Sequence, residues 1–229
     1  MTPRICVSIL PKTSLEASSL IKKAQKAQAS LIEVRLDCLE THGNLQEMTK
    51  NAKVPLIATN KLLSEKGFFA GTETEQQQSL LSAAENGFEY VDVDLSSPNH
   101  QETIDKIKKL GAKPIVSHHK LDGALTFPEM EMVLTQEIGC GASVCKIVGT
   151  AEKNEDNLAV LNFVASHSSK AKLVCFCMGE AGKVSRLLSP MFGAYFTFAS
   201  LENGRQTAAG QITIKEMKSV YNLLGANKR

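Results

Sequence analysis

Residues 143–149 read Ser143-Val144-Cys145-Lys146-Ile147-Val148-Gly149, a short apolar run that contains a single lysine. Its β-branched residues are typical of a buried strand. Burying an ammonium group is unfavourable unless the group is paired or gives up its proton. In one interpretation, burial lowers the pKa of Lys146 from about 10.4 toward neutrality, and the free amine attacks a ketone to form a Schiff base. In the other, the side chain reaches water or pairs with a carboxylate.

Similar β-rich runs recur along the whole chain, and polar segments with helix signals separate them. The other runs span residues 5–10, 31–37, 55–60, 90–95, 113–119, 173–179 and 195–199. The helix signals are a capping box at Thr72-Glu73-Thr74-Glu75, first-turn prolines at Pro98 and Pro128, and C-terminal glycines at Gly87, Gly111 and Gly139. Eight strands alternating with eight helices predict an α/β fold, a (β/α)8 TIM barrel spanning residues 1–229 as a single domain. A doubly wound open sheet is the alternative.

Composition narrows the function classes. A net charge of +2 over 229 residues gives no sign of a nucleic-acid surface or of binding to an anionic membrane. The N-terminus leads straight into a strand, so we expect a cytoplasmic protein. The six cysteines are spaced neither as a zinc site nor as a disulfide framework, which favours reduced core thiols and no bound metal.

A barrel gives the alternation within each strand a meaning, because alternate residues point inward and catalytic groups gather at the C-terminal mouth. In the run 31–37 the apolar residues would face the helices, and Glu33, Arg35 and Asp37 would line the interior. Ionisable residues on the inward faces of neighbouring strands are Glu33, Arg35, Asp37, Asp92, Asp94, His119 and Lys146. A barrel that only needed filling would use valine, isoleucine and leucine, so this set predicts a functional site.

Each member of this set also has a structural interpretation. Glu33 and Arg35 could pair with each other and simply fill the barrel. Asp94 could cap the next helix through Ser96-Ser97-Pro98. His119 follows His118, and one of the two histidines is expected to be a loop residue without a role in the site.

Several motifs in the same order resemble one family, the type I 3-dehydroquinate dehydratases. The matching segments are Glu33-Val34-Arg35-Leu36-Asp37, Ser117-His118-His119, Lys146, Met178-Gly179-Glu180-Ala181-Gly182-Lys183-Val184-Ser185-Arg186 and Thr207-Ala208-Ala209-Gly210-Gln211. The resemblance implies that Lys146 is the Schiff-base lysine and that His119 is the general acid and base, oriented by Asp94. It also implies substrate-binding roles, and the candidates for these are Arg186 for the carboxylate, Glu33 and Arg35 for ring hydroxyls, Thr207 and Gln211 on a closing loop, Lys61, and Ser8.

Three departures from the family pattern matter. Asp94 stands where the family has glutamate, so the carboxylate is one methylene shorter and its contact with His119 is open. Lys61 replaces an arginine, which keeps the charge but loses the two-pronged fork. Thr207 and Ala209 replace serine and proline in the closing loop, which keeps the hydroxyl but makes the loop less stiff.

The implied reaction converts 3-dehydroquinate to 3-dehydroshikimate in the shikimate pathway, and it needs no cofactor. Members of this family occur in two forms, so this chain could act as a homodimer or as the N-terminal half of a fusion with shikimate dehydrogenase. A Schiff-base aldolase on the same barrel is one alternative, with a phosphate site in the loops 179–182 and 202–205. A non-catalytic barrel that binds a carboxylate is the other, kept open by Asp94 and Lys61.

Overall fold

Eight parallel strands form one sheet that curves into a nearly closed barrel in the computed structural model, which describes residues 2–40, 44–204 and 206–226. The strands are β1 (Ile5–Ile9), β2 (Leu31–Arg35), β3 (Leu56–Thr59), β4 (Tyr90–Asp94), β5 (Lys113–His119), β6 (Val144–Thr150), β7 (Leu173–Met178) and β8 (Thr197–Ser200). From β1 to β7 neighbours in sequence are neighbours in the sheet, and β8 pairs with β1. Tyr195 N donates to Leu173 O at 2.7 Å where β7 approaches β8. The predicted barrel and its eight strands are confirmed.

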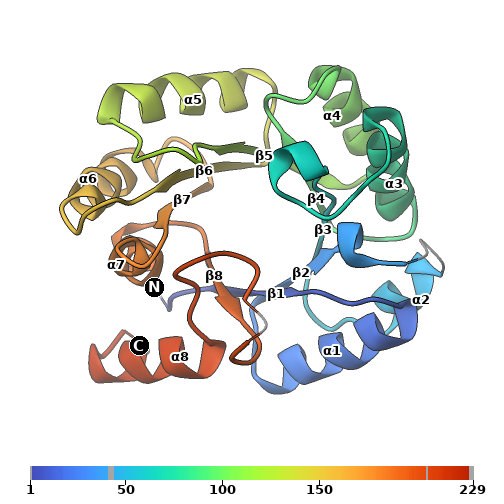
Figure 1. Cartoon of the computed structure of the whole chain (residues 1–229), viewed down its shortest axis with the longest axis horizontal. Helices are drawn as coiled ribbons and strands as arrows, with labels where there is room; N and C mark the ends of the chain where they lie inside the picture. Colours follow the sequence, from blue (N-terminus) through green and yellow to red (C-terminus); the bar gives the residue numbers. More distant parts are fainter. Residues whose placement is uncertain (1, 41–43, 205, 227–229) are drawn as a thin grey trace.

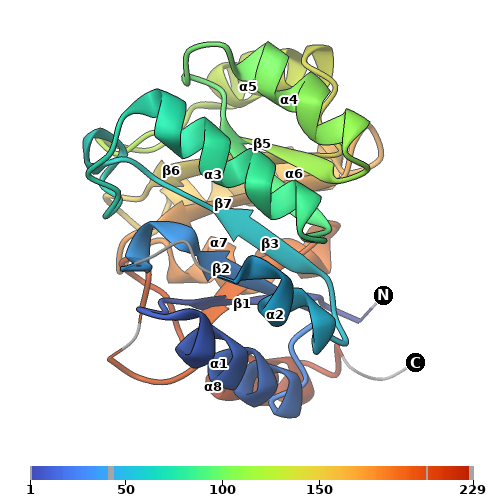
Figure 2. The ribbon, with the colours of Figure 1, turned by 90° about the vertical axis from the view of Figure 1, so that its right-hand side faces the viewer.

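The helices form a ring around the strands (Figure 1). In the described residues they are α1 (Ser14–Lys26), α2 (Leu45–Lys50), α3 (Glu73–Glu85), α4 (His100–Lys109), α5 (Phe127–Gly139), α6 (Asp156–His167), α7 (Lys183–Leu188) and α8 (Ile214–Leu223). Helices α1 and α8 lie side by side, although they come from opposite ends of the chain (Figure 2). Lys218 Nζ on α8 donates to Ala27 O at the end of α1 at 2.6 Å. No helix in the described ranges has the length and apolar character needed to cross a membrane.

Most of the predicted helix signals are confirmed, and one is wrong. The capping box at Thr72 and Glu75 begins α3, and Pro128 stands in the first turn of α5. Pro98, however, precedes the N-cap residue of α4, so it lies just outside that helix. Gly139 is the last helical residue of α5, as predicted, and the left-handed position after that helix belongs to Gly141, with φ +77°. A pattern of single residues marks a helix end only to within one or two positions.

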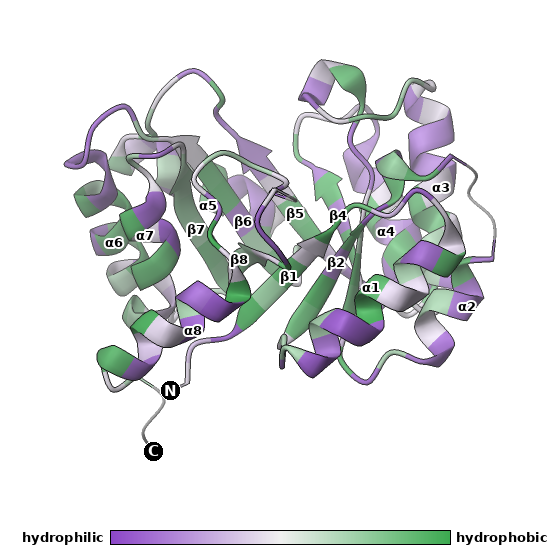
Figure 3. Ribbon diagram, turned by 60° about the horizontal axis from the view of Figure 1, so that its bottom comes forward, coloured by the Kyte–Doolittle hydropathy of each residue, from purple (hydrophilic) through white to green (hydrophobic). Residues whose placement is uncertain are grey.

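The barrel separates apolar side chains from polar ones along its axis. Outward-facing strand residues such as Ile32, Val34 and Val93 pack under the helices. The strands are accordingly the most hydrophobic part of the ribbon, while the helices are mixed (Figure 3). Inside the barrel, an apolar cluster that includes Phe196 and Phe198 fills the end from which the strands start. In β2 and β4 the inward positions nearer the carboxyl ends are polar, as predicted from the alternation, and they line a cavity together with apolar residues of β6 and β7.

Candidate active site

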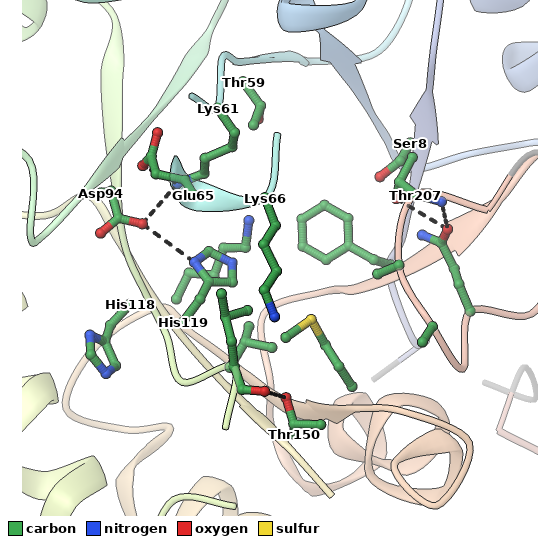
Figure 4. Close-up of a pocket in the computed structure, with 18 of the residues that line it drawn as sticks. Ser8, Thr59, Lys61, Glu65, Lys66, Asp94, His118, His119, Thr150 and Thr207 are labelled. Carbon is green, nitrogen blue, oxygen red and sulfur yellow. Dashed lines mark hydrogen bonds and ion pairs between the residues drawn. The ribbon is translucent and has the colours of Figure 1, made fainter. Parts of the chain in front are cut away.

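A cavity of about 640 Å³ opens at the carboxyl ends of the strands (Figure 4). All of the residues for which the sequence suggests a catalytic or binding role line it: Ser8, Glu33, Arg35, Lys61, Asp94, His119, Lys146, Arg186, Thr207 and Gln211. They come from strands, from strand ends, from the loops that follow β3 and β8, and from helix α7. The fold therefore brings together groups from opposite ends of the chain.

Lys146 projects from β6 into the barrel, and its side chain is 7% exposed. Its Nζ donates to Asp92 Oδ2 at 2.8 Å and lies 3.9 Å from Glu33 Oε1. The Phe198 ring closes the site beneath it, with Nζ 4.8 Å from the ring centroid. Lys146 therefore fits both interpretations of the sequence, because its amine pairs with a carboxylate and also faces the cavity, where it could react with a ketone. The ion pair with Asp92 stabilises the charged ammonium group of Lys146 inside the barrel.

His119 ends β5, and its Nδ1 lies 3.5 Å from Asp94 Oδ2, which is longer than an ordinary hydrogen bond. The shorter carboxylate therefore reaches the imidazole, but only loosely (Figure 4). Its other oxygen accepts from Ser96 N at 3.1 Å and Ser96 Oγ at 2.7 Å. Burial lowers the pKa of His119 from 6.5 to about 4, and the charges of Lys146 and Lys61 act in the same direction against the bond to Asp94. The imidazole is neutral at pH 7 and can accept a proton.

Lys61 follows β3 and is held by acidic side chains. Its Nζ lies 3.0 Å from Asp94 Oδ2, 3.2 Å from Asp92 Oδ1 and 3.8 Å from Glu65 Oε1. It also donates to Ser117 Oγ at 3.3 Å. Burial alone would lower the pKa of Lys61, but these carboxylates raise it well above its usual value. Lys61 is a permanent cation in the cavity wall, and its hydrogens face protein acceptors.

The inward residues of β2 are also fixed by neighbours. Ser8 Oγ donates to Glu33 Oε2, and Thr59 Oγ1 donates to Glu33 Oε1 at 2.9 Å. Arg35 makes a two-pronged contact with Asp37, where Nε lies 2.8 Å from Oδ1. Glu33 and Arg35 therefore do not pair with each other, as one interpretation of the sequence had it, because each is bound to other partners. Both lie in the cavity wall with a fixed orientation.

Arg186 is a buried cation without an acidic partner among the described residues. It lies on α7, it is 2% exposed, and its guanidinium carbon lies 4.3 Å from the centroid of the Phe176 ring. Burial lowers the pKa of Arg186 to about 10, so it stays charged at pH 7. Its Nε has no hydrogen-bond partner in the described structure, and one terminal nitrogen reaches Ala209 O at 3.5 Å. A buried, uncompensated guanidinium favours an anionic ligand, and a carboxylate matches its planar geometry.

The loop after β8 covers one side of the cavity. Gln211 Oε1 accepts from Thr207 N at 2.8 Å and from Thr207 Oγ1 at 3.1 Å. Gly179 N donates to Ala209 O at 3.2 Å, which joins this loop to the turn after β7. A Cβ at Gly210 would lie 2.0 Å from Gly179 O, so only glycine permits this approach. Arg205, in the loop 202–205 of the aldolase alternative, lies outside the described residues.

Asp92 is the main site residue whose role the sequence pattern did not indicate. It is 2% exposed, and it accepts from Lys146 and from Ser117 Oγ, the latter at 2.7 Å. Burial alone would raise the pKa of Asp92, but Lys146, Lys61 and His119 together hold it well below its usual range. Its inward position two residues before Asp94 was visible in the alternation. The pairing with Lys146 was not, since it depends on the register of β4 against β5 and β6.

An eight-stranded barrel with a buried amine, a neutral imidazole and an unpaired guanidinium around one cavity defines a TIM-barrel enzyme for a small anionic compound. The chain belongs to the type I 3-dehydroquinase family, whose model matches residues 5–228.

Relatives and solved structures of the same kind match over nearly the whole chain. A 3-dehydroquinate dehydratase of Dehalococcoides mccartyi is 33% identical over 219 residues, covering 96% of this chain and 95% of the relative. The crystal structure of 3-dehydroquinate dehydratase from Geobacillus kaustophilus has a TM-score of 0.90 at 21% identity and covers 99% of this chain and 93% of that one. A dehydroquinate dehydratase and shikimate dehydrogenase from S. pombe matches with a TM-score of 0.76 at 24% identity, covering 98% of this chain and 45% of that one.

Proposed function

We propose that this family member dehydrates 3-dehydroquinate to 3-dehydroshikimate through an imine on Lys146, with His119 as general acid and base. The overall activity, that of a carbon–oxygen lyase of the shikimate pathway, follows from the family. The assignment of residues rests on one observation above the others. Lys146 is a buried strand lysine whose amine faces the cavity with one close ion pair, whereas the buried Lys61 is held by three carboxylates. The family match favours the dehydratase over a sugar-phosphate aldolase, and the buried amine at the cavity favours an enzyme over a binding protein.

The imine solves the difficulty of removing a weakly acidic proton beside a ketone. The Lys146 amine attacks the ketone carbon, and water leaves as the carbon–nitrogen double bond forms. The protonated imine carries the same positive charge as the lysine did. Asp92, already within hydrogen-bond distance of that nitrogen, stabilises this charge in a site with little water. The carboxylate is therefore useful before and after the covalent bond forms.

His119 then moves one proton twice. The neutral imidazole takes a proton from the carbon next to the imine, and the electrons flow into an enamine. The enamine expels the hydroxyl group on the following carbon, and the imidazolium returns the proton to the departing oxygen. Hydrolysis of the imine releases the product and restores Lys146. Arg186 holds the carboxylate, and the loop from Thr207 to Gln211 limits access of water.

Reductive trapping tests this proposal directly. The protein is incubated with 3-dehydroquinate, sodium borohydride is added, and the intact mass and the peptide masses are measured. We expect an adduct of reduced substrate or product on the peptide that contains Lys146. An adduct formed only with a sugar phosphate would support the aldolase, and the absence of an adduct together with the absence of turnover would support a binding protein.

The pH dependence of kcat/KM should report the ionisation of His119. Because a general base must be neutral, and because burial lowers its pKa to about 4, we expect kcat/KM to fall only as the pH drops through about 4. The bond to Asp94 raises the pKa of the imidazole, so Asp94→Asn should move this acid limb to lower pH. Rate profiles of both proteins from pH 3.5 to 8 measure the limb. An acid limb near pH 6.5 in the wild-type enzyme would contradict the lowered pKa of His119.

The cellular setting follows from the same proposal. An enzyme that produces a precursor for further biosynthesis is expected in the cytoplasm. It would act as a homodimer or beside a shikimate dehydrogenase, as in the S. pombe protein whose structure resembles this barrel. Sedimentation of the purified chain measures the first of these assemblies.

A further inference from the structure

Lys66 is a second lysine at the cavity, and no motif in the sequence points to it. It follows the short 3-10 helix Leu63–Glu65 in the loop after β3, it is exposed, and it lines the cavity. Figure 4 shows its side chain extending from the loop into the pocket. Among the described residues, no carboxylate or other polar side chain binds its ammonium group. Lys61, Lys146 and Arg35 all have acidic partners, so Lys66 differs from them.

The loop fixes the point from which Lys66 extends. Its φ of +57° lies in the left-handed region, which a lysine rarely adopts. Lys66 N donates to Leu63 O at 3.1 Å, and Gly67 N donates to Leu62 O at 2.8 Å. Glu65 Oε2 accepts from Leu62 N at 2.7 Å and from Gln76 Nε2 at 2.7 Å. The backbone is held from both sides, so the left-handed residue is required by the turn and its side chain is directed by it.

Lys61 is already saturated with hydrogen bonds from the protein, so it is poorly placed to bind a substrate hydroxyl. Its nitrogen has three hydrogens, and four acceptors on Asp92, Asp94, Glu65 and Ser117 lie within 3.8 Å of it. A substrate hydroxyl would have to displace one of these bonds. Lys66 reaches the same wall of the cavity with its donors uncommitted. The cation on this wall that is available to a ligand is therefore Lys66.

The place of Lys66 in the barrel indicates which part of the substrate its ammonium group faces. Lys66 follows β3 and Arg186 follows β7, and the two strands are four places apart in an eight-stranded ring. They face each other across the mouth. If Arg186 holds the carboxylate of 3-dehydroquinate, the hydroxyl groups on the far side of the six-membered ring point toward β3. This step rests on the proposed function.

We propose that Lys66 is a substrate-binding residue that donates hydrogen bonds to the ring hydroxyls of 3-dehydroquinate opposite its carboxylate. Its contribution is to binding, since these ring hydroxyls neither leave nor change bonding in the reaction. Loss of the ammonium should raise KM with little change in kcat. A charge-assisted hydrogen bond at a partly exposed site corresponds to an increase in KM of roughly five- to twenty-fold.

Two variants separate the side chain from the backbone. Lys66→Gly removes the ammonium at a position where glycine relieves the left-handed conformation. Lys66→Met keeps the length of the side chain and removes the charge. Gln28→Gly is the matched control, because Gln28 also has a left-handed φ of 60° and is exposed outside the cavity. We expect both Lys66 variants to raise KM for 3-dehydroquinate and the control to leave it unchanged.

A simpler ketone tests which part of the substrate is recognised. 3-Oxocyclohexane-1-carboxylate has the ketone and carboxylate in the same relation but lacks the hydroxyls. The concentration that gives half-maximal borohydride trapping on Lys146 is measured with both ketones. We expect Lys66→Gly to raise it for 3-dehydroquinate only. An equal rise for both ketones would assign Lys66 to the carboxylate, and no rise for either would make it a solvated lysine; both results overturn the proposal. A wild-type enzyme that neither traps nor converts 3-dehydroquinate would instead refute the proposed function itself.

Discussion

Lys146→Ala is expected to lower kcat for 3-dehydroquinate by roughly 10⁴- to 10⁶-fold and to abolish borohydride trapping at this peptide. The reason is chemical, because the buried Lys61 amine is held as a cation by three carboxylates and cannot replace Lys146 in an imine with the ketone. Without the imine, the proton next to the carbonyl is too weakly acidic for His119 to remove. Steady-state rates and intact mass measure the two effects together.

The change also removes a buried charge, so the loss must be separated from a loss of structure. Asp92 keeps its contact with Lys61 at 3.2 Å in the variant, which limits the unpaired charge left behind. Circular dichroism and the thermal midpoint are the structural controls. Lys120→Ala is the matched lysine control, since Lys120 follows β5 outside the cavity and pairs with Glu129. Ethylamine, which can occupy the space left in Lys146→Ala, should restore part of the rate. An adduct retained in Lys146→Ala would contradict the assignment.

The fold could be predicted almost completely because its signals are local. Each strand is a short apolar run, and the two-residue alternation in β2 and β4 shows which side faces the helices and which faces the barrel. Once the barrel is assumed, residues as distant as Ser8 and Gln211 must meet at its mouth. The error at Pro98 concerns the start of a helix, where neighbouring residues can exchange the same role.

The partners within the site could not be predicted, because they depend on strand register and on loop conformation. Asp92 pairs with Lys146 because two intervening strand pairings set their heights, and no local pattern shows this. The same geometry gives Lys61 three acidic neighbours. Lys66 was missed for another reason, since a left-handed turn in a polar loop has no strand alternation to mark the direction of its side chains.

His119→Ala should separate imine formation from proton transfer. Lys146 and Arg186 remain in place, so we expect the variant still to be trapped by borohydride on Lys146. Its kcat should fall by roughly 10²- to 10⁴-fold, the usual contribution of a positioned general acid and base. Rates from product absorbance and the mass of the trapped adduct measure the two steps separately.

His118 provides the control for this experiment within the same segment. It is the preceding residue of β5, it also lines the cavity, and no described acidic group pairs with it, whereas His119 faces Asp94. His118→Ala should therefore retain turnover within a few-fold of the wild-type enzyme. The two variants remove the same ring from adjacent positions, so a general effect of losing an imidazole at the mouth would appear in both. Turnover that survives in His119→Ala but not in His118→Ala would make His118, not His119, the general base. That base would act from the outer edge of the cavity, where Asp94 does not pair with it.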